Sequence, residues 1–345
     1  MDILENVTVI IPAHNRPERL QRLLDYYRGT GLRVIVPDSS DALFTGRMDP
    51  EQVVYLHRPR LHFLLKIREI LPMISTRYVF YCADDDFIVP EAVCEIAEFL
   101  DRNPSYSCAQ GHYLTFTPCG DGVRFTPRYI RNFDSRVDGD SAVERLTGQL
   151  GMYASVLYGV VRTDAFIRTY QYCFDSKGEP RFRNLYLAEE FFHNSMLIHG
   201  CYATLPCFYS AREQIRNSAA QITVPSSVIK NSPEYRPEFD GFVRGLTLLL
   251  SECAGMLESE SEALIRRVVL APADKPSVLF KRRVNAFLDR HPLLGWASRL
   301  SVWRYHQKGL KAVRGLQSYP CTFSTPATEA IVRAVRSGCN VKKDY

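Results

Sequence analysis

The chain has 345 residues, of which 46% are hydrophobic and 23% are charged, with a formal net charge of +5 at pH 7. This length and composition are ordinary for a globular protein with one large domain and a smaller one. A net charge of +5 is too mild to indicate nucleic-acid binding, and no nucleic-acid-binding motif occurs, so we expect no nucleic-acid partner.

The N-terminal half opens with a β-branched run at residues 7–12, which predicts a buried strand that ends at Pro12. Residues 13–16, Ala-His-Asn-Arg, form a polar loop. Proline is favourable at the first position of a helix, so Pro17 is expected to begin an amphipathic helix. Its apolar positions with helical spacing are Leu20, Leu23, Leu24 and Tyr27.

Further strands are expected at residues 33–36 and 53–56 and from Tyr78 onward, with a helix at residues 61–73. Strands that alternate with helices indicate a mostly parallel sheet, in which ligand-binding groups gather at the carboxyl ends of the strands. Asn15, Asp38 and the acids after the last of these strands all lie at such ends. A single nucleotide-binding crevice accounts for all three positions.

Three consecutive aspartates, Asp84, Asp85 and Asp86, follow the strand that begins at Tyr78. Adjacent buried carboxylates repel one another and need a cation or solvent to compensate their charge. A divalent metal that carries a phosphorylated ligand is a natural partner, and an acidic turn that only ends the strand is the plain structural alternative. If the strand continues through these residues, Asp84 and Asp86 face one side and Asp85 faces the other.

The order and spacing of these motifs resemble those of the family 2 type nucleotide-sugar glycosyltransferases of the GT-A fold. The resemblance spans about residues 5–215 and is carried by Val9-Ile10-Ile11-Pro12-Ala13-His14-Asn15-Arg16, Asp38-Ser39-Ser40, Ala83-Asp84-Asp85-Asp86 and Pro90-Glu91-Ala92-Val93. It implies a Rossmann-like α/β fold with a mostly parallel sheet flanked by helices. The chain departs from the family in having one acid and no Gly in the second loop, and Ala83 where the Asp-x-Asp signature normally begins.

The resemblance also implies a Mg²⁺ or Mn²⁺ ion that bridges diphosphate oxygens, because these ions prefer oxygen ligands. Asp86 is the expected metal ligand, and Asp84 a second ligand or a ribose contact. A second alignment of the signature, anchored on Pro90, leaves Asp85 and Asp86 as the pair of acids at the metal site. Among the residues expected to bind the nucleotide, Asp38 is expected to contact its base. The full set is Pro12, Ala13, Asn15, Arg16, Asp38, Lys66, Asp84 and Asp85.

An inverting transfer needs a carboxylate that takes the proton of the acceptor hydroxyl. Residues 187–197 resemble the family's Glu-Asp helix start, which puts Glu190 in the position of the base and Glu189 beside it. The structural alternative is that two glutamates near a helix N-terminus only interact favourably with the helix dipole.

Strand-like segments at residues 108–117 and 153–162 would form the floor of the acceptor pocket, as in the enzymes that this chain resembles. Tyr153 and Tyr158 could then contact the acceptor sugar, although aromatic residues in half-buried strands are more often part of the core. Arg212 is the expected late phosphate contact.

A Pro- and Ser-rich stretch at residues 224–234 predicts a boundary between a glycosyltransferase domain at 1–225 and a helical region at 226–345. Helices are expected at 239–256 and 259–270, and two more at 281–316. The last segment is rich in basic and aromatic residues, so we expect peripheral contact with an anionic membrane that holds a lipid-linked acceptor. A solvated helix face is the alternative.

The ten cysteines are scattered, without a Cys-x-x-Cys pair or zinc-site spacing, and are expected to be reduced. No signal peptide precedes the first strand, and no apolar run reaches membrane-spanning length. These features predict a cytoplasmic location, including the inner face of the membrane.

The sequence therefore predicts a metal-dependent, inverting glycosyltransferase that moves a sugar from a nucleotide-sugar donor to a surface glycan or glycolipid. One alternative is a catalytically inactive GT-A module that binds a glycan or a partner, which Ala83 and the Glu189-Glu190 variation support. A sugar nucleotidyltransferase is less consistent, because such enzymes usually open with a Gly-rich phosphate loop and residues 13–16 contain no Gly.

Overall fold

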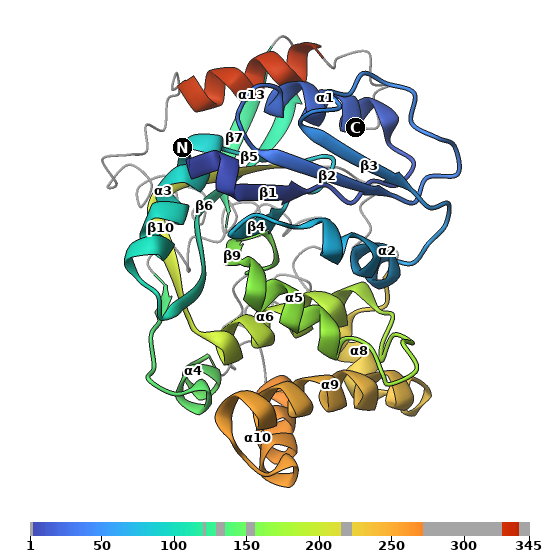
Figure 1. Cartoon of the computed structure of the whole chain (residues 1–345), viewed down its shortest axis with the longest axis vertical. Coiled ribbons are helices and arrows are strands. Elements are labelled where there is room, and N and C mark those ends of the chain that lie inside the picture. Colours follow the sequence, from blue (N-terminus) through green and yellow to red (C-terminus); the bar gives the residue numbers. More distant parts are fainter. Residues whose placement is uncertain are drawn as a thin grey trace, which may run out of the picture.

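A computed structural model describes residues 3–119, 122–128, 135–149, 156–214, 223–271 and 326–337. One mixed β-sheet forms the centre of this structure (Figure 1). Its strands are β1 (Val7–Ile10), β2 (Arg33–Asp38), β3 (Val53–His57), β4 (Tyr78–Tyr81), β5 (Phe87–Ile88), β6 (Tyr106–Cys119), β7 (Gly122–Arg128), β8 (Arg136–Val137), β9 (Val160–Arg162) and β10 (Cys201–Glu213).

The strand order is β3-β2-β1-β4-β9-β6-β10-β5, with β7 paired to β6 and β8 paired to β10. Strands β3, β2, β1 and β4 are parallel neighbours, as are β6 and β10. Strand β9 is antiparallel to both β4 and β6 and joins the two parallel groups. The predicted α/β class with a mostly parallel sheet is therefore confirmed.

Helices cover both faces of the sheet, because successive strand side chains point to opposite faces. Val9 packs with α1 (Pro17–Tyr27) and α3 (Pro90–Arg102), whereas the adjacent Ile10 packs with the helices on the other face. The helices in the core of that other face are α2 (Phe63–Ile70), α4 (Ala142–Gly148), α5 (Thr163–Tyr172) and α6 (Leu185–His199). Both faces are therefore buried, as the apolar runs of β1 and β2 require.

The chain after residue 222 adds helices to both sides of the sheet. Helices α8 (Ser226–Asn231), α9 (Arg236–Ala254) and α10 (Glu258–Leu270) extend the core beneath α5 and α6. Helix α13 (Pro326–Ser337) instead lies against α1 and β7, at the other end of the molecule from α10 (Figure 1). Ile331 and Val335 of α13 are buried in the core that contains α1.

One local prediction was wrong in the residues that the structure describes. A strand was expected at 153–162; of the described part of this segment, residues 156–162, only β9 is a strand, and a 3₁₀ turn at Val156–Tyr158 precedes it. The Pro- and Ser-rich stretch at 224–234 folds as α8 and the start of a 3₁₀ turn, Pro233–Tyr235, because Pro is compatible with a first helical turn. Helix α9, which follows this stretch, packs directly on α6. The domain boundary at residue 225 stays a prediction.

The helices expected at 281–316, with their basic and aromatic residues, lie outside the described residues. Among the helices that the structure does describe, none has the length and apolar character needed to cross a membrane.

Candidate active site

The loops after β1 and β2 are joined through their backbones. The amide of Ala13 donates to the Pro37 carbonyl at 3.2 Å, and the amide of Ser39 donates to the Ala13 carbonyl at 3.1 Å. Asn15 has a positive φ of 53°, a conformation that Asn tolerates better than most residues, and its amide donates to Ser40 Oγ at 2.7 Å. The structure thus brings the predicted nucleotide-binding residues of the two loops together at one edge of the sheet.

Lys66 of α2, which lies on the face of the sheet opposite α1, contacts the same two loops. Its Nζ donates to the Ala13 carbonyl at 2.9 Å and to Ser39 Oγ at 3.1 Å, and the residue is only 4% exposed. Burial lowers the pKa of Lys66 from 10.5 to about 8, and the charges of Asp38 and Asp84 oppose this change. The ammonium is therefore part of the scaffold of the site.

Lys66 should consequently make a contribution to stability that rises with pH between about 8 and 10.5. The folded state releases this proton at a lower pH than the unfolded chain, so deprotonation favours folding in that window. The gain should be about 3 kcal/mol at 1.4 kcal/mol per pH unit. Burial raises the pKa of thiols such as Cys108, which acts in the opposite direction over this range. The readout is therefore a difference: urea unfolding at pH 7.5 and 10 should show the parent gaining stability relative to Lys66→Met. Lys177→Met, at an exposed position, is the control. Equal pH dependence in the parent and Lys66→Met would contradict the assignment.

Asp38, expected at the nucleotide base, is 1% exposed and closes its own loop. Its Oδ1 accepts hydrogen bonds from the Ser40 amide at 2.8 Å and the Ser40 hydroxyl at 2.5 Å. Its Oδ2 accepts from the Tyr55 hydroxyl of β3 at 2.8 Å. The carboxylate thus fixes the shape of the loop, and its contact with a nucleotide base stays a prediction.

The three aspartates lie on a turn between β4 and β5 and do not continue the strand. The amide of Asp86 donates to the Ala83 carbonyl at 3.0 Å, which closes the turn. The expectation that Asp84 and Asp86 share one side is therefore wrong. Asp84 and Asp85 both contact Arg16, whereas Asp86 contacts Arg212 on the neighbouring strand β10.

Each of these carboxylates lies against a guanidinium group. Arg16 Nη1 lies 3.1 Å from Asp84 Oδ1 and 2.8 Å from Asp85 Oδ2. Arg212 Nε lies 3.0 Å from Asp86 Oδ2, and the Glu213 amide donates to Asp86 Oδ1 at 3.0 Å. Burial raises the pKa of Asp84 and of Asp86 above the usual value of aspartate, and the neighbouring arginines oppose the rise.

A second ion-pair group lies directly behind the aspartates. Glu213, at the end of β10, contacts Arg19 at 3.3 Å and Arg22 at 2.6 Å, and Arg22 also donates to the Asp85 carbonyl at 3.1 Å. Although burial alone would raise it, the pKa of Glu213 is lowered below its usual value by Arg22 and Arg19. Sequence analysis missed both arginines. The spacing of Arg16, Arg19 and Arg22, which puts them on one helix face, was the available signal.

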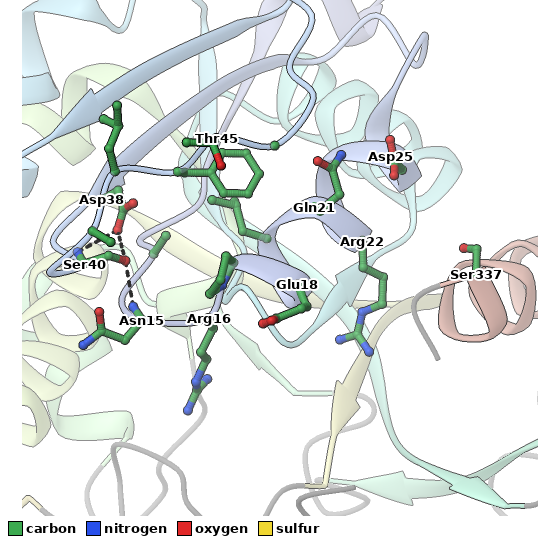
Figure 2. A pocket seen from close by; sticks show the side chains of 17 residues that line it. Asn15, Arg16, Glu18, Gln21, Arg22, Asp25, Asp38, Ser40, Thr45 and Ser337 are labelled. Atoms are coloured by element: carbon green, nitrogen blue, oxygen red, sulfur yellow. Dashed lines mark hydrogen bonds between the residues drawn. The ribbon is translucent and has the colours of Figure 1, made fainter. Parts of the chain in front are cut away.

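A cavity of about 500 Å³ opens between α1 and the loop after β2 (Figure 2). Its walls include Asn15, Arg16, Asp38 and Ser40, together with residues 42–46 and Ser337 of α13. In Figure 2 the side chains of Arg16 and Arg22 extend from α1 away from Asp38 and Thr45. The cavity therefore adjoins the predicted nucleotide-binding loops on the α1 side of the sheet.

The residues present do not fit the expected Mg²⁺ or Mn²⁺ ion. Such ions need several oxygen ligands that converge on one point. Within the ranges that the structure describes, no group of three or more His, Cys, Asp or Glu side chains is arranged to hold a metal ion. The three aspartates are instead paired with arginines, so an added divalent cation would lie beside guanidinium groups.

The two predicted catalytic glutamates point to different neighbours. Both lie on α6, whose N-terminus is capped by Asn184. Glu190 Oε2 lies 2.6 Å from Lys230 Nζ of α8. Glu189 lies close enough to Tyr158 for its charge to raise the pKa of the Tyr158 hydroxyl, in addition to the larger effect of burial. The catalytic roles of both acids stay predictions.

Tyr158 lies beside Arg212, the partner of Asp86. The guanidinium of Arg212 lies 4.7 Å from the centre of the Tyr158 ring, and the Tyr158 carbonyl accepts a hydrogen bond from Tyr209. The charges of Asp86 and Asp85 also contribute to raising the pKa of Tyr158. Tyr158 and Arg212, both predicted to contact substrate, are thus brought together, whereas Tyr153 lies outside the described residues.

No family model and no curated protein matches this chain. Among solved structures, it is similar to the crystal structure of S. aureus TarS 1-349 in complex with UDP-GlcNAc, with 12% identity and a TM-score of 0.47 over 96% of this chain and 90% of that one. The complex of TarS 1-349 with UDP gives 14% identity and a TM-score of 0.47 over 96% and 89%. The structure titled S. aureus TarS gives 15% and 0.44 over 96% and 53%. These similarities assign neither a residue role nor an activity to this chain.

Proposed function

We propose that this protein is an inverting glycosyltransferase that uses a nucleotide-sugar donor and an acceptor on a glycan or glycolipid. The observation that carries the proposal is the meeting of three loops at one edge of the sheet. Residues 13–16 after β1 contact Ser39 and Ser40, which follow Asp38 at the end of β2, and Arg16 contacts the acids after β4. In open α/β sheets, the crevice at the carboxyl ends of the strands is where ligands bind.

In this proposal the catalytic base comes from α6. We propose Glu189, because it contributes to the raised pKa of Tyr158, whose ring lies 4.7 Å from the guanidinium of Arg212. Glu190, which the sequence pattern favours, is already paired with Lys230.

The transfer balances as a single displacement. The acceptor oxygen forms a bond to the anomeric carbon, the bond from that carbon to the donor diphosphate breaks, and the hydroxyl proton passes to the glutamate. A single displacement of this kind inverts the anomeric configuration.

A nucleotide-sugar screen tests the proposal. A nucleotide sugar or nucleoside diphosphate should raise the midpoint of thermal unfolding, because a ligand at 100 times its dissociation constant adds about 2.7 kcal/mol of stability. The same nucleotide sugar should be slowly hydrolysed, since water can replace the acceptor hydroxyl. Release of nucleoside diphosphate provides the readout, and NMR of the freed sugar gives the configuration.

The outcomes separate the proposed enzyme from the alternatives. Binding without hydrolysis or transfer to any acceptor would indicate the inactive GT-A module that Ala83 suggests. Formation of a nucleotide sugar from a sugar phosphate would indicate a nucleotidyltransferase. Binding of no nucleotide by the folded protein would contradict the proposal itself.

A further inference from the structure

The sheet edge that holds the aspartates carries equal numbers of acidic and basic groups in one cluster. Its four carboxylates belong to Asp84, Asp85, Asp86 and Glu213, and its four guanidinium groups to Arg16, Arg19, Arg22 and Arg212. Each carboxylate has at least one arginine within 3.3 Å. The cluster is therefore charge-compensated by the chain itself.

The arginines of this cluster differ in depth. The side chains of Arg19 and Arg22 are 10% and 4% exposed, and they hold Glu213. Those of Arg16 and Arg212 are 25% and 22% exposed, and they hold the aspartates at the solvent side. The inner pair thus anchors the cluster, while the side chains of the outer pair are partly exposed to solvent.

We propose that Arg16 and Arg212 bind the diphosphate of the donor directly, in the place where the sequence pattern predicts a divalent cation. The proposal rests on the nucleotide-sugar function given above. The planar guanidinium matches a phosphate group and remains charged at every physiological pH. Each outer arginine is held by carboxylates, so little side-chain freedom remains to be lost when an anion binds.

The position of the two arginines suits a leaving diphosphate. Arg16 is the N-cap residue of α1, where the helix dipole adds to the positive potential. The guanidinium of Arg212 lies 4.7 Å from the centre of the Tyr158 ring and contacts Asp86 at 3.0 Å. Negative charge that develops on the diphosphate as the sugar leaves would be stabilised by both guanidinium groups, without a metal ion.

Calorimetric titration of the full chain with nucleoside diphosphates and inorganic pyrophosphate, each in EDTA and in Mn²⁺, tests this inference. For each ligand that binds, we expect the dissociation constant in EDTA to be within about threefold of the dissociation constant in Mn²⁺. This corresponds to a difference in binding free energy of under about 1 kcal/mol. Arg16→Gln and Arg212→Gln should each weaken binding in EDTA by about tenfold or more, because each removes a charge-assisted hydrogen bond. Arg102→Gln, which removes an exposed arginine paired with Glu98, should bind like the parent.

Circular dichroism would show whether the variants fold, and Arg16→Lys, which keeps the charge and loses the planar fork, should bind more weakly than the parent. The comparison of EDTA with Mn²⁺ uses only the parent protein, so it tests the inference even if a variant fails to fold. Nucleotide binding that requires Mn²⁺ would overturn this inference and leave the proposed function intact. Pyrophosphate binding in EDTA without binding of any nucleotide would support the arginine site and contradict the proposed function. Binding of neither in either buffer would overturn both.

Discussion

Replacement of Glu189 by Gln should lower the rate of sugar transfer by about 10²–10⁴-fold while donor affinity stays nearly unchanged. Glutamine keeps the size and most of the packing of glutamate but cannot accept the proton of the acceptor hydroxyl. Glu189 contributes to the raised pKa of Tyr158, whose ring lies under Arg212, whereas Glu190 is paired with Lys230. Release of nucleoside diphosphate under single-turnover conditions measures the chemical step, and calorimetry measures donor affinity.

Glu190→Gln is the matched comparison, because the two residues are adjacent on α6 and the substitution is the same. Glu190 is paired with Lys230, so its loss should mainly weaken the contact between α6 and α8 and lower the rate much less. If Glu190→Gln proves the slower variant and Glu189→Gln turns over like the parent, the base is Glu190, as the sequence pattern suggests. A product with retained anomeric configuration would exclude a single displacement, whichever glutamate is essential.

The order and type of the N-terminal elements could be predicted because they depend on local pattern. A β-branched run predicted β1 and a Pro followed by helical spacing predicted α1, and both lie within two residues of the expected positions. The placement of Asn15 and Asp38 at one edge also followed, since the carboxyl ends of parallel strands share an edge. Periodicity and topology were sufficient for this part of the site.

The partners of the aspartates could not be predicted, because they depend on contacts between residues far apart in the chain. Arg212 reaches Asp86 across 126 positions, and Arg19 reaches Glu213 across 194. Viewed alone in the sequence, Arg19 is an ordinary surface charge, and the pattern around Arg212 predicted a phosphate contact rather than a pairing with Asp86. Only the folded sheet, which brings the end of β10 beside the turn after β4, shows that the acids are compensated by the chain itself.

Replacement of Glu213 by Gln should lower the free energy of unfolding by about 3–5 kcal/mol, the usual cost of removing one partner of a buried ion pair. The side chain of Glu213 is 1% exposed, and the substitution leaves the buried charges of Arg19 and Arg22 without their carboxylate. The loss should exceed that of a surface pair many times over. Urea unfolding of the two proteins at pH 7 measures the difference.

Glu98→Gln provides the control, since it removes the exposed partner of Arg102 on α3 and should cost no more than about 0.5 kcal/mol. The difference between the parent and Glu213→Gln should also depend on pH. The pKa of folded Glu213 lies below its ordinary value of 4.5, so the stabilisation is fully present above pH 4.5 and is lost as pH falls through the folded pKa. A gap that is small at pH 7, or that widens as the solution is acidified below 4.5, would show that Glu213 does not stabilise the fold as a buried carboxylate. In that case Arg19 and Arg22 would have to be held by other groups, and the inner anchor of the cluster would be misassigned.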